Sequence, residues 1–106
     1  MIAKMRCLLR ASRKWLKRKA DARVRAVARV LCRHDPEGLI EIGAPADEYD
    51  YEAQQIAARL PRAKSEDEAR RLAVDVFQRA FDRDYPADDP TFRAIARDLW
   101  SLKDEE

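Results

Sequence analysis

The stretch SEDEARRLAVDVFQRAF, residues 65–81, carries the strongest helix pattern in the chain. Its start matches a capping box, with Ser65 at the N-cap and Glu68 at the third helical position. Apolar residues then recur at spacings of three and four, which gathers them on one face of an α-helix. These residues are Ala69, Leu72, Ala73, Val76, Phe77, Ala80 and Phe81. The stretch therefore predicts an amphipathic helix whose apolar face must pack against further helices.

Two other segments have the same period and start signals of their own. Asp47 is a suitable N-cap for a helix that stops at Pro61, and Asp89 is one for a helix with Pro90 at its first position. The apolar side of the first helix consists of Tyr49, Ala53, Ile56 and Leu60. That of the second consists of Phe92, Ile95, Ala96, Leu99 and Trp100.

The N-terminal third of the chain predicts either one long helix or two. Val24, Val27 and Leu31 line one side of residues 20–33, and no Pro or Gly occurs between residues 2 and 33. Any break in the helix would lie near residues 19–21.

Turn signals follow this helix. Asp35 is predicted to cap a short turn with Pro36 at its first position. Gly43 and Pro45 mark a second turn, and residues 82–89 a further loop. The apolar residues between the first two turns are predicted to be buried, namely Leu39, Ile40 and Ile42.

The composition fits a single all-α domain, a small array of four or five helices. A chain of 106 residues suits one core, and the 46% of hydrophobic residues can supply it. Only two glycines are present, and β-branched residues are few, which favours helix over strand. We expect residues 1–19 to be a basic amphipathic extension and residues 20–106 to form the helical domain.

The net charge of +2 hides a strong asymmetry along the chain. Residues 1–33 hold twelve Lys or Arg and one acid, a balance of +11, whereas residues 34–106 hold ten Lys or Arg and nineteen acids, a balance of −9. Such a division indicates either a basic arm that binds an anionic partner or two parts that attract each other.

Residues 1–19 contain no acid and allow three interpretations. They form an exposed helical extension, an arm that lies on nucleic acid or an anionic membrane, or an organelle-targeting peptide. Six of these residues are candidates for binding an anion: Arg13, Lys14, Trp15, Lys17, Arg18 and Lys19.

Catalytic chemistry has little support in this sequence. His34 is the single histidine, and neither Cys7 nor Cys32 has a second thiol or a histidine at the spacing of a zinc site. Gly38 and Gly43 are too few for a phosphate-binding loop. We expect no enzymatic activity, no cofactor and no metal, and the absence of a disulfide framework makes the cytoplasm the expected compartment.

The stretch ADEYDYE, residues 46–52, packs four carboxylates and two tyrosines into seven residues. Its acids do not have the alternating spacing of a calcium loop. Asp47 and Asp50 are accounted for by helix initiation, and Tyr49 is predicted to face the core. The remaining residues suggest a contact surface for a partner, centred on Glu48, Tyr51 and Glu52 and including Asp47 and Asp50.

Two strings within residues 22–60 resemble a family of small bacterial helical proteins of uncharacterised function. They are VRAVARVLCRHDPEGL and GAPADEYDYEAQQIAARL. In that family a W-D-P-[IL]-G turn follows the first helix and a D-E-Y-D segment opens the second. The matching residues are Asp35, Pro36, Gly38, Asp47, Glu48, Tyr49 and Asp50, whereas His34 stands where the family has Trp. The likeness extends over roughly residues 22–100, includes the paired Phe77 and Phe81, and leaves residues 1–19 outside.

The resemblance implies the helical fold and a bacterial cytoplasmic setting. Such acidic-faced helical proteins are similar in design to immunity proteins, which neutralise a basic toxin. We therefore expect a non-enzymatic interaction module with a basic protein partner. The alternative is a binder of nucleic acid or anionic membrane through residues 4–25.

Overall fold

The computed structural model describes residues 2–45 and 47–104, and of residues 2–16 only the backbone. Four α-helices follow one another, with one short 3₁₀ turn between the second and the third. They are α1 (Ile2–His34), α2 (Asp50–Arg59), η1 (Leu60–Arg62), α3 (Glu66–Phe81) and α4 (Pro90–Asp104). No strand occurs in the described ranges, so the predicted all-α array is confirmed.

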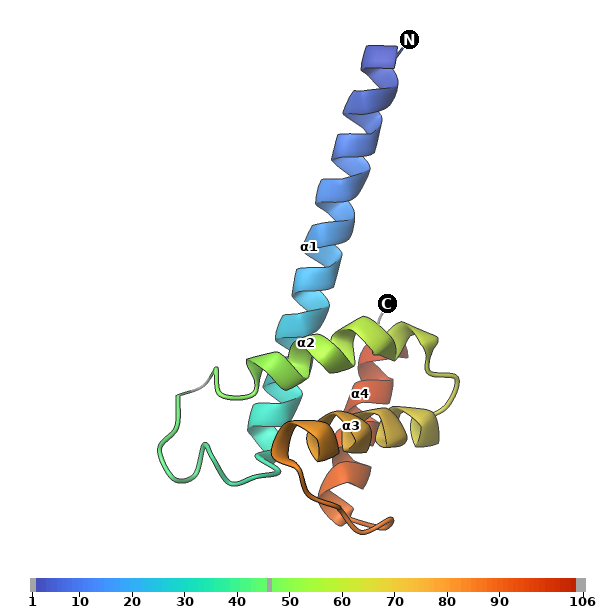
Figure 1. Ribbon diagram of the computed structural model, residues 1–106. Helices are drawn as coiled ribbons and strands as arrows, with labels where there is room; N and C mark the ends of the chain where they lie inside the picture. The colour runs from blue at the N-terminus through green and yellow to red at the C-terminus, as the bar shows by residue number, and fades with distance from the viewer. Residues whose placement is uncertain (1, 46, 105–106) are drawn as a thin grey trace.

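The core lies where the C-terminal part of α1, α2, α3 and α4 meet (Figure 1). Phe77 of α3 is at its centre and is fully buried. Its ring centroid is 5.9 Å from that of Tyr49, 5.6 Å from that of Phe81 and 5.4 Å from that of Phe92. Rings at these separations add edge and stacking interactions to the burial of apolar area. The apolar face predicted for residues 65–81 is therefore the centre of the fold.

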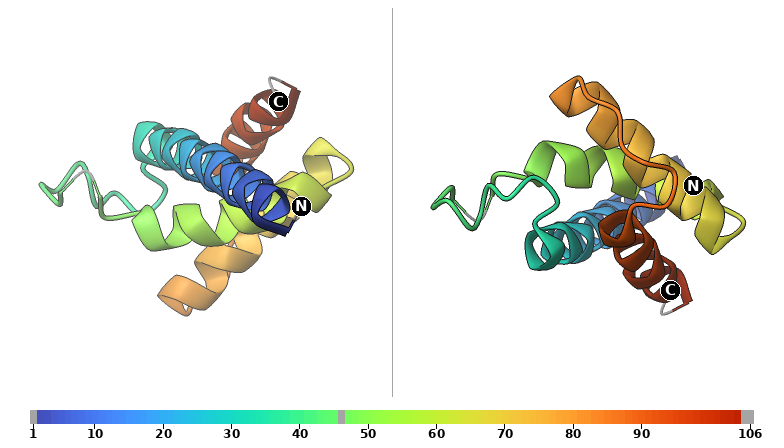
Figure 2. Two further views of the ribbon diagram at one scale, coloured as in Figure 1. Left: turned by 90° about the horizontal axis from the view of Figure 1, so that it is seen from above. Right: turned by 90° about the horizontal axis from the view of Figure 1, so that it is seen from below.

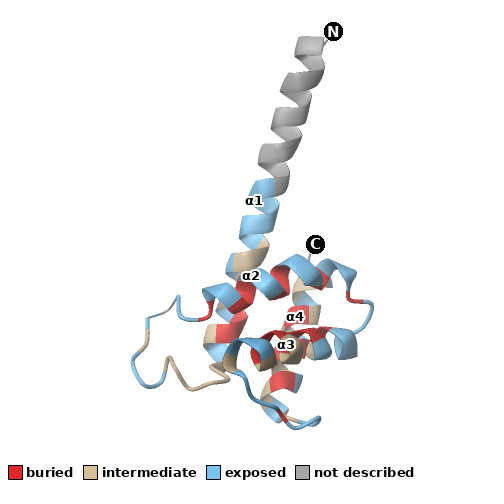
Figure 3. Cartoon of the chain, viewed as in Figure 1, coloured by how far each residue is buried: buried red, intermediate tan, exposed pale blue. Residues whose placement is uncertain are grey.

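The first helix is continuous through residues 19–21, so the long-helix alternative holds. Its two parts have different surroundings (Figure 3). Val27 and Leu31 are fully buried, whereas every residue from Lys17 to Ala22 is exposed. The α1 axis extends away from the other three helices (Figure 1), and in the described part of the chain the buried residues of α1 are Val27, Val30 and Leu31.

The start of α2 differs from the prediction. The helix begins at Asp50 with Tyr49 at the N-cap and no side-chain cap, so the prediction that Asp47 is the N-cap is wrong. Instead the backbone N–H of Asp50 donates to the Asp47 carbonyl at 3.0 Å, in a turn before the helix. Tyr49, at the N-cap, is fully buried in the core.

The caps of α3 and α4 agree with the prediction. The Ser65 hydroxyl accepts from the backbone N–H of Glu68 at 3.1 Å, and the Asp89 carboxylate accepts from that of Thr91 at 2.8 Å. The Glu68 carboxylate accepts from the backbone N–H of Lys64, one residue before the position that a capping box specifies.

The connection between α1 and α2 stands out from the helices in both views of Figure 2. Leu39 and Ile40 are partly buried against the core. Ile42 is 79% exposed, so the prediction that it is buried is wrong. The turn that contains Ile42 lies beyond the reach of the helices, because Gly38 and Gly43, both at positive φ, turn the chain on either side of it.

Candidate functional site

The most distinctive electrostatic feature is a continuous segment without basic side chains. Residues 34–58 contain seven acids and no Lys or Arg. We call this range the acidic segment. It covers the end of α1, the protruding connection and most of α2 (Figure 1). The structure divides its carboxylates into three environments.

Asp35 belongs to the interior of the connection. Its φ is +46°, and its carboxylate accepts from the backbone N–H groups of Ile40 and Glu41, each at 3.0 Å. The Tyr49 hydroxyl also donates to it at 2.7 Å. Desolvation alone would raise the pKa of Asp35, but these hydrogen bonds together lower it below its ordinary value. Asp35 therefore holds the turn instead of capping a short helical turn as predicted.

Glu37 continues this network toward α4. Its side chain is 8% exposed, and its carboxylate accepts from the Tyr85 hydroxyl and from Arg83 at 3.2 Å. The backbone N–H of Glu37 donates to the Tyr49 hydroxyl at 3.1 Å. Burial, together with hydrogen bonding to a carboxylate, raises the pKa of both Tyr49 and Tyr85. Asp35 and Glu37 thus tie the connection to the core and are structural carboxylates.

The next carboxylates of the segment face solvent. Asp47, Glu48, Asp50 and Glu41 are exposed, and within the described part of the chain their side chains form no hydrogen bond or ion pair. Two large apolar residues of the same segment are exposed as well, Ile42 at 79% and Tyr51 at 62%. We define the acidic surface as Glu41, Ile42, Asp47, Glu48, Asp50 and Tyr51. Four of the five residues predicted to bind a partner belong to it.

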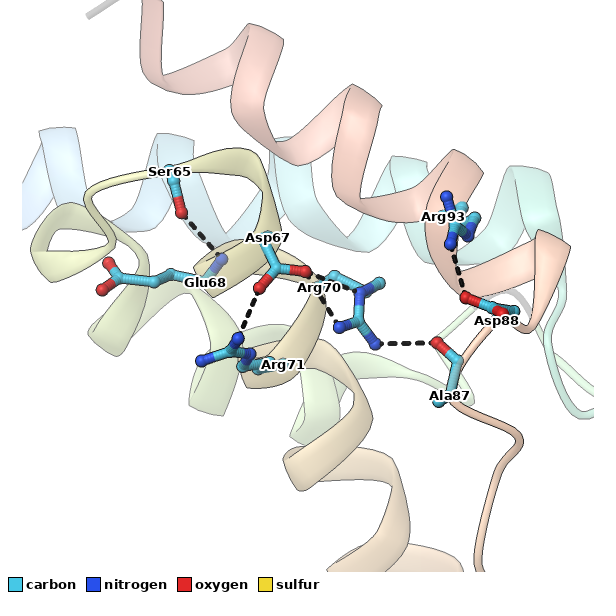
Figure 4. A network of polar contacts seen from close by, with 8 residues as sticks. All are labelled: Ser65, Asp67, Glu68, Arg70, Arg71, Ala87, Asp88 and Arg93. Carbon is cyan, nitrogen blue, oxygen red and sulfur yellow. Dashed lines mark hydrogen bonds and ion pairs between the residues drawn. The ribbon is translucent and has the colours of Figure 1, made fainter.

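Four acids elsewhere in the helical body are paired with arginines. Asp67 contacts Arg70 and Arg71 at 2.9 and 2.8 Å, and Asp88 contacts Arg93 at 2.5 Å (Figure 4). Asp75 pairs with Arg59 at 3.0 Å and Asp98 with Arg33 at 3.3 Å. Hydrogen bonding to Arg70 lowers the pKa of Asp67, and hydrogen bonding to Arg59 lowers that of Asp75. The acidic surface differs in that four exposed acids without such a pair lie together in a segment that contains no Lys or Arg.

Glu52 was also predicted to bind a partner, and the structure places it elsewhere. It is 6% exposed, so it does not take part in the acidic surface. Its Oε2 atom is buried and has no hydrogen-bond partner. Burial, aided by the charge of Glu48, raises the pKa of the Glu52 carboxyl. Its spacing of three from Tyr49 and four from Ile56 was the sequence signal for an inward position.

Tyr51 also borders a shallow groove between α2 and α3. The groove has a volume of about 150 Å³ and is lined by Tyr51, Gln55, Arg59, Val76, Arg79 and Ala80. Val76 and Ala80 contribute apolar surface to it, while Arg59 and Arg79 both contact Asp75, at 3.0 and 3.3 Å, along one side. An aromatic side chain at the edge of such a groove can contribute apolar area to a protein contact.

The predicted anion-binding residues lie on α1. Lys17, Arg18 and Lys19 are exposed on the part of the helix that extends from the body. Arg13, Lys14 and Trp15 fall outside the residues whose side chains are described. The charge of Asp50 acts on the Cys32 thiol, whose pKa is raised chiefly by burial, so the start of α2 lies near Cys32. Lys17 is fifteen residues before Cys32, which is about 22 Å along a helix axis. The exposed lysines and the acidic surface are thus held apart.

His34 has a structural partner that the sequence did not reveal. Its Nε2 lies 2.7 Å from Oδ2 of Asp98, which also accepts from Arg33. A carboxylate oxygen only accepts, so Nε2 carries the proton. The contact links the end of α1 to α4. In the described ranges no cluster of His, Cys, Asp or Glu side chains has the arrangement of a metal site, and no helix has both the length and the apolar character to cross a membrane.

Comparisons with known proteins return nothing that resembles this chain. No protein-family model matches it, and neither the curated proteins nor the solved structures contain a match. The resemblance carried by the turn at Asp35 and the segment at Asp47 therefore stays a prediction.

Proposed function

We propose that the chain is a non-enzymatic, cytoplasmic interaction module that presents its acidic surface to a basic protein. One observation carries the proposal. The carboxylates of Asp47, Glu48, Asp50 and Glu41 are exposed and without an ion pair in the described structure, and all four lie in a segment of 25 residues that contains no Lys or Arg.

The acidic surface has the chemistry of a protein contact. Carboxylates of one sign attract a basic partner over a distance of about a Debye length and chiefly speed its association. The exposed side chains of Ile42 and Tyr51 supply apolar area that a purely electrostatic site lacks. An immunity- or antitoxin-like role fits this combination, since such a protein binds a basic partner rather than transforming a substrate.

The test uses the purified chain as bait for proteins of its native host. The variant Asp47→Lys with Asp50→Lys reverses two charges of the acidic surface. Its matched control, Asp84→Lys with Asp104→Lys, makes the same change in net charge at exposed acids elsewhere. A true partner is retained by the wild type and by the control and is lost with the first variant, and its binding weakens as salt rises. A set of retained proteins that is identical for both variants would refute the proposal.

A second candidate function rests on the shape of α1. This helix extends from the body with Lys17 and Arg18 exposed, and no acid precedes Asp21. Such an arm suits nucleic acid or an anionic membrane. Binding would then fall steeply with salt and would be lost in Lys17→Glu with Arg18→Glu. Duplex DNA, single-stranded RNA and vesicles with and without anionic lipid are the probes. Affinity that does not change with salt, or none for all three, would exclude this candidate.

A further inference from the structure

The arm and the acidic surface have opposite charge but cannot meet within one chain. Residues 1–33 carry a balance of +11 and residues 34–106 one of −9. Because α1 is a single helix, Lys17 and Arg18 are fixed on a rod that leads away from the start of α2 (Figure 1). A flexible linker would let Lys17 and Arg18 fold back onto the acidic surface of their own chain, and a continuous helix does not.

Close to the acidic surface, α2 holds a buried carboxyl oxygen that has no hydrogen-bond donor. Glu52 is buried, its Oε2 has no hydrogen-bond partner, and it lies within electrostatic range of Glu48. A buried carboxylate without a donor is costly, and a cationic side chain docked at its edge reduces that cost. The exposed acids at the start of α2 and the buried carboxyl of Glu52, which interacts electrostatically with Glu48, therefore both favour a nearby cation.

We propose that the acidic surface of one copy binds the basic arm, residues 2–22 of α1, of a second copy. The proposal rests on the proposed function, since it names the partner of the same surface. The arm fits that partner because it is a preformed basic helix with Lys17 and Arg18 exposed. A preformed helix loses less conformational entropy on docking than a flexible peptide does.

The contact joins two different surfaces, so its symmetry is informative. If two copies exchange arms reciprocally, a closed dimer forms, and if they do not, the contacts continue into an open chain of copies. In both arrangements the average molecular mass of the species in solution rises with protein concentration and falls as the salt concentration rises. Sedimentation velocity distinguishes them, because a closed dimer stops at twice the mass of one chain.

Charge reversal provides the test. The arm variant is Lys17→Glu with Arg18→Glu, and the surface variant is Asp47→Lys with Asp50→Lys. We expect either variant alone to weaken self-association at least tenfold at about 50 mM salt. Two control variants make equal charge changes at other exposed positions: Arg62→Glu with Arg97→Glu, and Asp84→Lys with Asp104→Lys. Both controls should self-associate as the wild type does.

Mixing the two variants is the decisive measurement. The arm variant still has an acidic surface and the surface variant still has a basic arm, so a mixture restores the original contact between unlike chains. We therefore expect the equimolar mixture, and a chain with all four substitutions, to recover association that neither double variant shows alone. Circular dichroism of each variant confirms that the helices are intact.

Two outcomes would overturn the inference. One is a wild-type chain that stays monomeric at low salt and up to high micromolar concentration. The other is association that both double variants retain. Neither outcome affects the proposed function, which is judged by host proteins retained on the acidic surface. Conversely, self-association rescued by mixing, with no host protein retained, would support the inference and limit the partner to the chain itself.

Discussion

The two halves of the acidic segment contrast sharply, although their residues are of the same kind. In the first half, Asp35 and Glu37 accept hydrogen bonds from tyrosine hydroxyls, and Asp35 also binds two backbone N–H groups. In the second half, Asp47, Glu48 and Asp50 are exposed and have no side-chain partner in the described structure. The role of a carboxylate is thus set by the hydrogen-bond donors that the fold brings to it. A count of acids cannot distinguish the two halves.

Glu52 combines features of both groups. It is buried like Glu37 but has no donor for Oε2, and it lies in the same short segment as the exposed acids. Substitutions in these environments should therefore differ in their effect on the free energy of unfolding and on its pH dependence. The largest effect is expected at Asp35 and the smallest at the exposed acids.

Replacing Asp35 should have the largest effect. Asp35→Ala removes the acceptor of three hydrogen bonds and places a residue that disfavours positive φ at +46°. We expect the free energy of unfolding to fall by about 3 kcal/mol, measured by urea denaturation. Asp35→Asn keeps the turn geometry and should lose less. Equal stability of Asp35→Ala and wild type would show that the hydrogen bonds of Asp35 do not support the fold.

Tyr49→Phe should have the next largest effect, with Tyr51→Phe as its matched control. The Tyr49 hydroxyl donates to Asp35 and accepts from the backbone N–H of Glu37, so its loss leaves two groups short of a partner. We expect a loss of about 1–2 kcal/mol in the free energy of unfolding for Tyr49→Phe. The control should change it by less than about 0.5 kcal/mol, because Tyr51 is exposed. Similar losses in both variants would contradict the contrast.

Glu52→Gln should change the pH dependence of stability. The folded-state pKa of Glu52 is raised, so its contribution is most favourable below the unfolded-state value of about 4.3 and is lost as pH rises through the folded value. The variant removes this loss, and we expect it to be about 1 kcal/mol more stable than wild type near pH 7. Thermal melts of both proteins between about pH 2 and 7 on one buffer series check the difference.

The same melts test Asp35, whose pKa shift has the opposite sign to that of Glu52. Its folded-state pKa is lowered, so its contribution is present above the unfolded-state value of about 3.9 and is lost as pH falls through the folded value. In Asp35→Asn this acidic loss should be smaller than in wild type. If the stability of wild type and of both variants did not change with pH across this range, the distinction between the buried carboxyl of Glu52 and the hydrogen-bonded carboxylate of Asp35 would be wrong.

The smallest effect belongs to the exposed carboxylates of the acidic segment. Glu41→Gln with Glu48→Gln removes two exposed charges that have no partner among the described residues. We expect the free energy of unfolding to change by less than about 0.5 kcal/mol. Urea denaturation at low and high salt gives the measurement. A loss above 1 kcal/mol would mean that these acids support the fold and are not available for a partner.

Periodicity and capping chemistry were enough to predict most of the fold. The apolar spacing within residues 65–81 placed Phe77 in the core, and Asp89 with Pro90 located the start of α4. These signals are local, because helix period and N-caps depend on residues within one or two turns. Whether α1 was continuous was left open by the sequence, since neither Pro nor Gly punctuates it.

The connection and the site depended on contacts that are distant in sequence. Asp47 was predicted to be an N-cap because nothing local showed that Tyr49 would bind Asp35, fourteen residues earlier. Ile42 was predicted to be buried because hydrophobicity says nothing about how far a loop reaches from the core. For Glu52 the period did indicate the inner face, but residue type argued for the surface, and the backbone position decided.

The unbroken course of α1 has a consequence for how the arm is kept helical. A helix that stands alone must form its first turn at a cost, whereas the exposed turn at Lys17 only extends a helix already nucleated by Val27 and Leu31 in the core. Amide protons should therefore exchange faster by gradual steps from Leu31 toward Lys17, with no jump at residues 19–21. The arm therefore depends on the core for its helix: a change that loosens the core also unwinds the arm, while the arm itself frays first.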